Sequence, residues 1–557
     1  MDICDLADRH AGKPLGGDPD WWRGVVIYQI YPRSYQDSSG NGIGDLKGIE
    51  GRLDHIHSLG VDAIWVSPFY PSPMDDFGYD ISDYCAVDPM FGSLADFDGL
   101  IAAAHDRGIR VIVDLVLSHT SDRHPWFAES RQSRDNPKAD WYVWADPKPD
   151  GTPPNNWLAL FGGVAWEYDT RRGQYYLHNF LRSQPDLNFH NHEVQDAVMG
   201  VARFWLDRGV DGCRMDVVNF FFQDKDLRDN PAVPAKAPLT GVDSANPYVM
   251  QQHLHDHTQP ENLVFLERLR GVLDSYEAVT SVGEVGAVTD LTKTMGAYTE
   301  VGKRLHMVYN FELLSYGLSA AHVRAVAEAI ERDIGGGWPG WTTSNHDAVR
   351  VVTRWGGTKD IARAAPLFSA ILLTLRGTAF VYQGEELGLT EADIAFEKLQ
   401  DPFGKQFWPG YKGRDGCRTP IPWDTESLRA GFSDAEPWLP IPVEHRRFAV
   451  ADQESDPASV LNRFRKLIAW RAAHPVLRLG SIAFLDQPEP ILAYVREYDG
   501  LRFLCVFNLS PDPVDALIGN IASVEAVTGH GFEDTAQVEE PDSLHLDGRG
   551  AFFATFG

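Results

Sequence analysis

The sequence predicts an α/β protein built on a (β/α)8 TIM barrel, with a loop-rich domain inserted after the third strand and a C-terminal antiparallel β domain. Three observations predict it: eight short apolar runs recur, helical patterns separate them, and alternating strands appear only near the C-terminus. Nearly continuous apolar runs of this length are typical of parallel strands buried on both faces. Eight such strands alternating with helices fit a closed parallel barrel. A doubly wound open sheet is the alternative, but no G-x-G-x-x-G motif follows the first strand.

The predicted strands lie within residues 24–32, 61–69, 110–119, 212–220, 280–285, 306–311, 340–347 and 377–386. Helical periodicity is clearest at residues 94–108, 194–209 and 261–276, which lie between these strands. The barrel is expected to occupy residues 1–119 and 189–475, with the inserted domain at residues 120–188. An irregular insertion at about 388–445 follows the eighth strand, and alternating strands over 476–557 form the C-terminal domain.

The amino-acid composition limits the classes of molecule that the protein is expected to bind. The 557 residues carry a net charge of −29, which repels nucleic acid and anionic membranes. No apolar run is long enough to span a bilayer, and the first twenty residues lack the pattern of a signal peptide. The five scattered cysteines indicate reduced thiols and a cytoplasmic protein. We therefore expect a small neutral substrate, no nucleic acid or membrane partner, and a monomer or homodimer.

Charged and polar residues stand at the ends of four predicted strands. They are Asp114 and His119 on the third, Arg214 and Asp216 on the fourth, Glu284 on the fifth, and Asn345, His346 and Asp347 on the seventh. In a barrel these strand ends share one face, where catalysis occurs. Retaining glycosidases need two neighbouring carboxyl groups, one a nucleophile and one an acid with a raised pKa. Arg214 lies two residues before Asp216 and so points to the same side of its strand. A buried structural ion pair of Arg214 with Asp216 is the alternative.

The same segments resemble those of a known family. The four main sequence regions of the α-amylase superfamily, glycoside hydrolase family thirteen, are similar to DLVLSH (114–119), GCRMDVVN (212–219), VGEV (282–285) and SNHD (344–347). QPDLN (184–188) resembles the marker of the oligo-1,6-glucosidase branch, which includes bacterial α-glucosidases. The segments GRDGCRTPIPW (413–423) and PPNNWLALFGG (153–163) resemble α-glucosidases with transglucosylation activity. The resemblance covers nearly the whole chain.

This resemblance implies a role for each matching residue. Asp216 matches the nucleophile, Glu284 the acid/base and Asp347 the group that stabilises the transition state. The residues that match the binding site of the terminal glucose are Asp76, Tyr79, His119, Phe161, Arg214, His346 and Arg414. A paired Asp76 and Arg414 would close the pocket where a longer sugar chain continues, which explains exo action.

The loop DSSGNGIGD (37–45) follows the first strand and places oxygen atoms at alternate positions. These belong to Asp37, Ser39, Asn41 and Asp45, with the Ile43 carbonyl as a further ligand. The spacing resembles a calcium loop, and related glucosidases carry a structural Ca²⁺ or Mg²⁺ there. A plain Gly/Asn turn is the alternative. No cofactor is expected for the chemistry itself.

The sequence thus predicts a retaining exo-α-glucosidase acting on short substrates such as maltose or sucrose through a covalent glucosyl-enzyme intermediate. Transfer of glucose to acceptor alcohols is one alternative, because water and acceptor compete for the same intermediate. Val217 resembles the residue of branch members that cleave α-1,6 bonds, so isomaltose is a second alternative. A non-catalytic scaffold of the same fold is the remote one.

Overall fold

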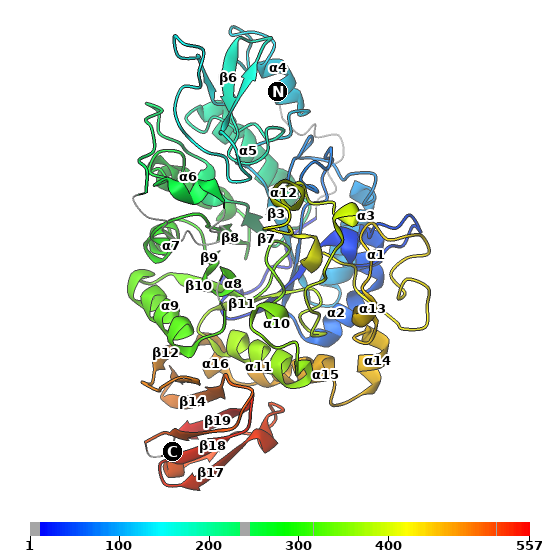
Figure 1. The fold of residues 1–557 in the computed structure, drawn as a ribbon, viewed down its shortest axis with the longest axis vertical. Helices are drawn as coiled ribbons and strands as arrows, with labels where there is room; N and C mark the ends of the chain where they lie inside the picture. The colour runs from blue at the N-terminus through cyan, green and yellow to red at the C-terminus, as the bar shows by residue number, and fades with distance from the viewer. Residues whose placement is uncertain (1–11, 234–245, 316, 520, 557) are drawn as a thin grey trace. The chain divides into compact units, whose positions relative to one another are not determined.

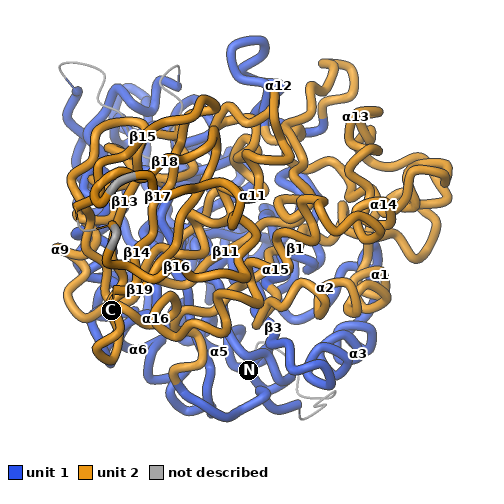
Figure 2. The backbone as a smooth tube through the Cα atoms, turned by 90° about the horizontal axis from the view of Figure 1, so that it is seen from below, with its two compact units in different colours: residues 1–19, 65–311, 400–413 blue, residues 20–64, 312–399, 414–557 orange. Residues whose placement is uncertain are grey.

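The computed structural model describes residues 12–233, 246–315, 317–519 and 521–556 (Figure 1). The chain divides into two compact units (Figure 2). One comprises Met1–Pro19, Trp65–Phe311 and Gln400–Gly413, and the other comprises Asp20–Ile64, Glu312–Leu399 and Arg414–Gly557.

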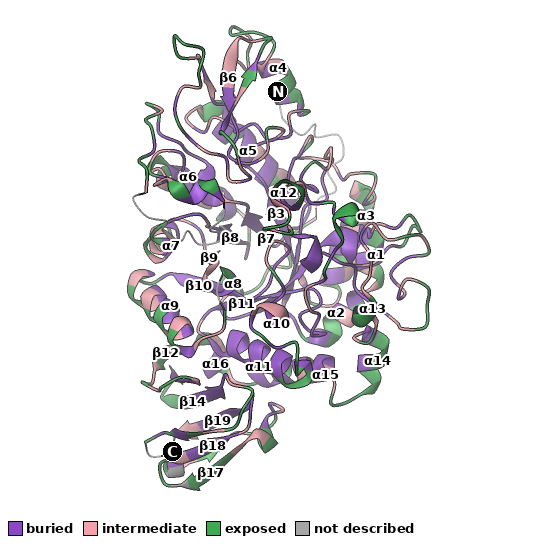
Figure 3. Cartoon of the chain, in the orientation of Figure 1, coloured by how far each residue is buried: buried purple, intermediate pink, exposed green. Residues whose placement is uncertain are grey.

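Eight parallel strands form a closed barrel, as the sequence predicts, in the order β1-β11-β10-β9-β8-β7-β3-β2. The strands of the barrel are β1 (Val26–Ile30), β2 (Ala63–Val66), β3 (Arg110–Leu115), β7 (Gly212–Met215), β8 (Thr280–Glu284), β9 (Met307–Tyr309), β10 (Trp338–Thr342) and β11 (Thr378–Tyr382). Apart from Arg110, every residue of these strands is buried (Figure 3). Their continuous apolar composition follows from burial on both faces.

The register of three neighbouring strands positions the charged residues of the first unit. Asp114 of β3 lies opposite Arg214 of β7, and Arg214 lies opposite Val282 of β8. Asp216 comes directly after β7, and Glu284 is the last residue of β8. Parallel pairing in this register therefore brings the polar ends of β3, β7 and β8 together.

Helices separate the barrel strands, and several of them begin at a residue whose side chain caps the helix. Ser93 and Asp96 form a capping box at α3, and the side chains of Asn191 and Ser319 cap α5 and α9. These helices are α1 (Leu46–Gly51), α2 (Leu53–Leu59), α3 (Leu94–His105), α5 (His192–Leu206), α6 (Glu261–Leu273), α7 (Leu291–Tyr298), α8 (Glu312–Ser315), α9 (Ala320–Asp333), α10 (Val351–Arg354) and α11 (Ile361–Thr374). Helices α14 (Val450–Ser455), α15 (Val460–Ala472) and α16 (Pro475–Leu479) follow the irregular segment after β11, which holds α12 (Pro402–Phe407) and α13 (Val443–Arg446).

The segment between β3 and α5 contains α4 (Pro125–Ser130) and a small antiparallel sheet of order β4-β6-β5. Its strands are β4 (Trp144–Ala145), β5 (Trp166–Asp169) and β6 (Gln174–Leu177). The buried rings of Trp157 and Trp166 stack in its core with centroids 5.9 Å apart. This segment therefore has an apolar core of its own, which its irregular sequence did not reveal.

The C-terminal part consists of two antiparallel sheets, of order β12-β13-β14-β19-β16 and β15-β18-β17. Their strands are β12 (Ser481–Phe484), β13 (Ile491–Tyr498), β14 (Leu501–Asn508), β15 (Val514–Leu517), β16 (Val524–Ala526), β17 (Ala536–Glu540), β18 (Ser543–Leu546) and β19 (Ala551–Phe556). Side chains of both sheets share one apolar core, which includes Val506, Leu544 and Ala554. The predicted antiparallel β domain is confirmed.

Two further expectations concern the whole chain. Among the described residues, no helix is long and apolar enough to cross a membrane. Cys213, Cys417 and Cys505 are buried free thiols, but Cys85 is disulfide-bonded, so the expectation of five reduced thiols is wrong for Cys85. Cys4 lies outside the described residues.

Candidate active site

A single buried guanidinium joins the three carboxyl groups at the ends of β3, β7 and β8. Arg214 donates from Nη1 to Asp114 Oδ1 at 2.7 Å and to Asp216 Oδ1 at 2.6 Å, and from Nη2 to Glu284 Oε2. Arg214 and Asp114 are fully buried, and Asp216 is 6% exposed. The two carboxyl groups proposed for the chemistry therefore lie side by side, as the sequence predicts.

Burial and charge act against each other in this cluster. Burial raises the pKa of Asp216, Arg214 lowers it, and the negative charge of Asp114 raises it further. The neighbouring carboxyl group of Glu284 lowers the pKa of Asp216. Since one guanidinium serves three buried carboxyls, the pair keeps a proton at a pH where isolated carboxyls are ionised. One ionised and one protonated carboxyl is the state that nucleophile and acid require.

The acid/base candidate Glu284 is held on more than one side. Tyr309 donates its hydroxyl to Oε1 at 3.3 Å, and the backbone N–H of Val217 donates to Oε2 at 3.1 Å. Val217 has φ 35° and ψ 51°, a left-handed conformation that a β-branched residue rarely adopts. This strained residue directly follows Asp216, so the backbone after one carboxyl orients the other.

The predicted substrate-binding residues of the first unit form a connected network. Tyr79 donates its hydroxyl to Asp114 Oδ2 at 3.0 Å, and its carbonyl accepts a hydrogen bond from His119 Nε2 at 2.9 Å. Gln184 donates to Asp76 Oδ2 at 3.1 Å and to the Tyr79 carbonyl at 3.3 Å. Burial lowers the pKa of His119 to about 4, so its ring is neutral at pH 7. Gln184 is a functional candidate that residue-by-residue reasoning missed, although it begins the QPDLN marker.

Phe161, the last predicted binding residue of this unit, lies in an aromatic cluster. Its ring is 5.5 Å from that of Phe180 and stacks on Phe403 at 5.0 Å between centroids. Phe220, three residues after Val217, belongs to the same buried cluster. Phe180 contacts the rings of both Phe161 and Phe220, so Phe161 shares one cluster with the segment that follows the nucleophile candidate.

The remaining predicted residues lie in the second unit, where Asp347 meets three positively charged or polar partners. Arg418 donates to Asp347 Oδ1 at 2.6 Å and Arg414 donates to the same oxygen at 3.3 Å. His346 Nε2 lies 3.3 Å from Asp347 Oδ2, and Gln29 donates to His346 Nδ1 at 2.7 Å. Although burial raises the pKa of Asp347, these neighbours hold it well below its usual range, so this carboxylate is ionised.

Arg418 is the second residue that sequence reasoning missed. It lies in the GRDGCRTPIPW segment, four residues after Arg414, and it makes the shorter contact with Asp347. The pairing of Arg414 with Asp76 stays a prediction, because these residues belong to different units.

The predicted metal loop, residues 37–45, is stabilised by its own hydrogen bonds. Asp37 accepts from the backbone N–H groups of Ser39, Gly40 and Gly42 and from the hydroxyl of Ser433 at 2.5 Å. Burial alone would raise the pKa of Asp37, but these hydrogen bonds lower it. Asp45 caps α1 through Gly48 and also accepts from Ser38. In this arrangement a cation would compete with N–H and O–H donors for both carboxylates, so the loop in this form does not fit one.

Two further predicted ligands of that loop add little to a binding site as they stand. Asn41 is exposed, and its side-chain oxygen accepts from the backbone N–H of Ile43 at 2.8 Å. Ser39 donates its hydroxyl to Asp37 at 3.1 Å. The cation therefore stays a prediction that depends on a rearranged loop.

The chain is similar to proteins of known families along most of its length. Residues 29–480 match the model of the alpha amylase catalytic domain. A probable alpha-glucosidase from Rhizobium meliloti is 54% identical over 97% of this chain and 98% of its own. An oligo-1,6-glucosidase from Heyndrickxia coagulans is 38% identical over 89% of this chain and 93% of its own. The crystal structure of an alpha-glucosyl transfer enzyme, XgtA, superposes with a TM-score of 0.94 at 55% identity, covering 96% of this chain and 99% of its own.

Proposed function

The chain belongs to the alpha-amylase family and is a glycoside hydrolase, and we propose that it is a retaining, exo-acting α-glucosidase that uses Asp216 as nucleophile and Glu284 as acid/base. The observation that supports this most is the Arg214 guanidinium bonded to both carboxyl groups. In this proposal the guanidinium keeps Asp216 ionised on one face of the bound sugar, while Glu284 keeps the proton that an acid needs. Similarity to α-glucosidases and an oligo-1,6-glucosidase supports the same conclusion.

The proposed reaction has two steps. In the first, Asp216 forms a bond to the anomeric carbon while the glycosidic bond breaks and Glu284 transfers its proton to the departing oxygen. In the second, Glu284 takes a proton from water, whose oxygen displaces Asp216 and releases glucose. Asp347 is proposed to stabilise the positive charge of both transition states, since its carboxylate is ionised.

We propose exo action on short substrates such as maltose and sucrose, with Asp76 and Arg414 closing the glucose-binding pocket. Transfer to an acceptor alcohol is the second candidate, and the similarity to an alpha-glucosyl transfer enzyme favours it. In that reaction an alcohol replaces water in the second step. Hydrolysis of isomaltose is a third, supported by the similarity to an oligo-1,6-glucosidase. We also propose that the enzyme works in the cytoplasm as a monomer or homodimer.

A substrate panel with two readouts tests this function. Maltose, sucrose, isomaltose, trehalose and starch are compared by glucose release, and NMR records the anomer of the first glucose formed. Retention predicts α-glucose from every cleaved α-glucoside, with starch cleaved least. Release of β-glucose, or faster cleavage of starch than of disaccharides, would contradict the proposal. Added alcohol acceptors convert glucose into glucoside products if transfer dominates.

Glu284→Gln should separate substrates by their leaving group. We expect cleavage of maltose to slow by about 10²–10⁴-fold, because the departing oxygen then lacks a proton donor. The first step with p-nitrophenyl α-glucoside should slow much less, since p-nitrophenolate leaves without protonation. Single-turnover rates on both substrates measure the difference. An equal decrease in rate on the two substrates would show that Glu284 is not the acid that protonates the departing oxygen.

Asp114→Asn should move the acidic limb of the pH profile of kcat/KM to lower pH. Burial is the largest cause of the raised pKa of Asp216, and the charge of Asp114 adds to it. Without that charge Asp216 stays ionised at lower pH, so activity persists there. Asn retains one acceptor oxygen for Tyr79 but loses the acceptor for Arg214. A shift of this limb to higher pH would show that Asp114 does not act on the nucleophile through its charge.

We propose that loop 37–45 binds Ca²⁺ or Mg²⁺ as a structural ion after the loop rearranges and frees the carboxylates of Asp37 and Asp45 from their present hydrogen bonds. Bound Ca²⁺ predicts that EDTA lowers the melting temperature and that added Ca²⁺ restores it. Asp45→Asn keeps a residue able to cap α1 but loses a charge, so it should remove the response to Ca²⁺. If neither EDTA nor Ca²⁺ changes the melting temperature, loop 37–45 binds no structural ion and is a turn held by its own hydrogen bonds.

A further inference from the structure

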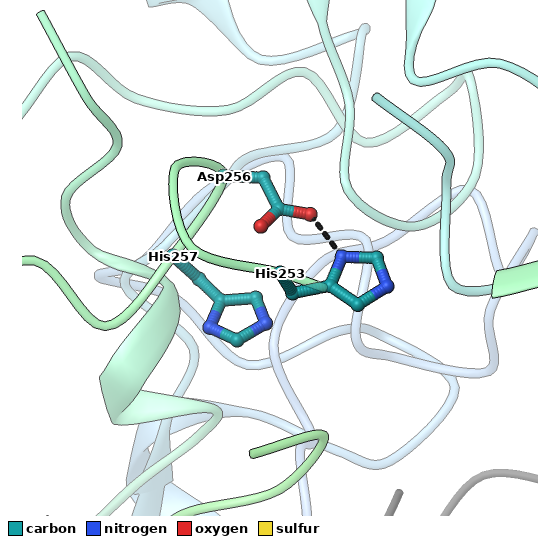
Figure 4. A group of neighbouring side chains, drawn as sticks. All are labelled: His253, Asp256 and His257. Carbon is teal, nitrogen blue, oxygen red and sulfur yellow. Dashed lines mark hydrogen bonds and ion pairs between the residues drawn. The ribbon is translucent and has the colours of Figure 1, made fainter. Parts of the chain in front are cut away.

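Three side chains of the loop between the short helix η4 (Pro247–Met250) and α6 lie close together (Figure 4). They are His253, Asp256 and His257, and each offers a ligand atom within 4.8 Å of the others. They are 8%, 0% and 2% exposed. Two imidazoles and a carboxylate around one point are a donor set of divalent transition metals.

Both imidazoles are oriented by hydrogen bonds on the far side of the ring. His253 Nε2 donates to the Tyr248 carbonyl at 2.8 Å, so Nδ1 is the ring nitrogen that faces the cluster. His257 Nδ1 lies 2.6 Å from the hydroxyl of Thr258, which leaves Nε2 for the cluster. Metal-binding histidines are usually fixed in this way, with the second ring nitrogen donating to an oxygen.

Two atoms of the cluster lack the partner that burial demands. Within the described residues, neither Asp256 Oδ1 nor His257 Nε2 has a hydrogen-bond partner at normal geometry, although Asn230 lies near enough to Asp256 to lower the pKa of its carboxyl. A buried polar atom without a partner is costly to the fold. The contact of His253 Nδ1 with Asp256 Oδ2 at 2.5 Å satisfies only the other carboxylate oxygen. A simple His–Asp ion pair therefore does not account for the whole cluster.

We propose that His253, Asp256 and His257 bind a divalent transition-metal ion, with Zn²⁺ as the best match. Zn²⁺ accepts a mixture of nitrogen and oxygen ligands in tetrahedral geometry, and a water molecule would complete the set. Ligand atoms about 2.0–2.1 Å from the ion stand about 3.3 Å apart. Binding would thus lengthen the contact between His253 and Asp256 by less than an ångström. The nitrogen ligands distinguish this site from loop 37–45, which offers oxygen atoms alone.

The position of the cluster gives the ion a structural role next to the chemistry. The backbone N–H of Thr258 donates to the carbonyl of Asn219 at 2.7 Å, and Asn219 donates to the carbonyl of Gly286 at 3.0 Å. Asn219 and Gly286 follow Asp216 and Glu284 in the chain by three and two residues. The ring of His257 lies 4.6 Å from that of Phe220. An ion bound here braces the segments that carry both carboxyl groups.

The test uses the full-length protein and Zn²⁺ alone. Protein treated with chelator and dialysed is titrated with Zn²⁺ by calorimetry, and its melting temperature is followed in parallel. We expect one equivalent to bind tightly and to raise the melting temperature by several degrees. His257→Gln and Asp256→Asn should weaken binding by more than about tenfold, because loss of even a hydrogen-bond partner of a metal ligand typically costs about 10–100-fold. With Co²⁺ as a spectroscopic probe, the wild type should show visible absorption that His257→Gln loses.

Two control variants separate this site from other binding. His445→Gln removes a buried histidine outside the cluster, and Asp216→Asn removes a carboxylate of the proposed active site. Both should keep one equivalent of Zn²⁺. Absence of binding and of a thermal shift in the wild type would overturn the proposal, as would wild-type affinity in His257→Gln. Loss of binding in Asp216→Asn alone would place the ion at the catalytic carboxyl groups and would also overturn it.

Discussion

Asp216→Asn is expected to lower kcat on maltose by on the order of 10⁴-fold or more, the loss typical of removing a nucleophile. The amide cannot form the glucosyl ester, and it also removes the negative charge that faces the developing cation. Its size matches that of the carboxylate, so the fold should be retained. Glucose release measures the rate. Asp169→Asn, at a buried aspartate of β5 that binds Arg131, is the matched control and should keep wild-type kcat.

Chemical rescue makes this result specific to the nucleophile. Asp216→Ala leaves space in which azide can attack the anomeric carbon of p-nitrophenyl α-glucoside and displace p-nitrophenolate. The product of that single displacement is β-glucosyl azide, with inverted configuration, and NMR identifies it. Rescue that yields α-glucosyl azide, or wild-type turnover of Asp216→Asn, would reject Asp216 as the nucleophile.

Arg214→Met is expected to cause the largest loss of stability among single changes in this cluster. It leaves Asp114, Asp216 and Glu284 buried without a counter charge, and breaking a buried ion pair in this way costs about 3–5 kcal/mol. Urea unfolding measures the free energy of unfolding, and activity should be lost as well. Arg324→Met, in an exposed pair with Glu328, should change stability by about 1 kcal/mol or less.

The destabilisation by Arg214→Met should depend on pH in a defined direction. Without the guanidinium, the folded-state pKa of these carboxyls lies above the unfolded value. In the wild type, burial already raises the pKa of Asp114 to about 6 and that of Asp216 to about 7 despite Arg214. Both proteins therefore hold these protons at lower pH, and the gap in stability opens as pH rises through this range and above it. The gap between variant and wild type should narrow on acidification. A gap that widens as pH falls would mean that the carboxyls do not depend on Arg214 for their charge.

The barrel and the main carboxyl groups could be predicted because each depends on a short stretch of sequence. Buried parallel strands give apolar runs, and Asp216, Glu284 and Asp347 stand where such runs end. Contacts that depend on distant segments could not be predicted in this way. The bond of Arg418 to Asp347, the link of Gln184 to Asp76, and the left-handed backbone of Val217 arise only after the chain has folded.

Local patterns left one feature undetected and another open. The segment 120–188 has little periodicity, yet it forms a three-stranded sheet around Trp157 and Trp166, because short strands of two to four residues leave no repeat to detect. The oxygen atoms of loop 37–45 alternate as cation ligands do, but hydrogen bonds within the turn use the carboxylates of Asp37 and Asp45. The spacing of the oxygen atoms alone does not distinguish carboxylates that bind a metal ion from carboxylates that accept hydrogen bonds within a turn.

The register of β3, β7 and β8 links strand alignment to charge. Because alternate residues of a strand point to opposite faces, a slip of β7 by one residue would turn Arg214 away from Asp114 and Glu284. Misaligned barrels would then bury uncompensated carboxylates, whereas the native alignment neutralises them. The residues proposed to perform the reaction would thus also favour the native alignment of the strands that carry them.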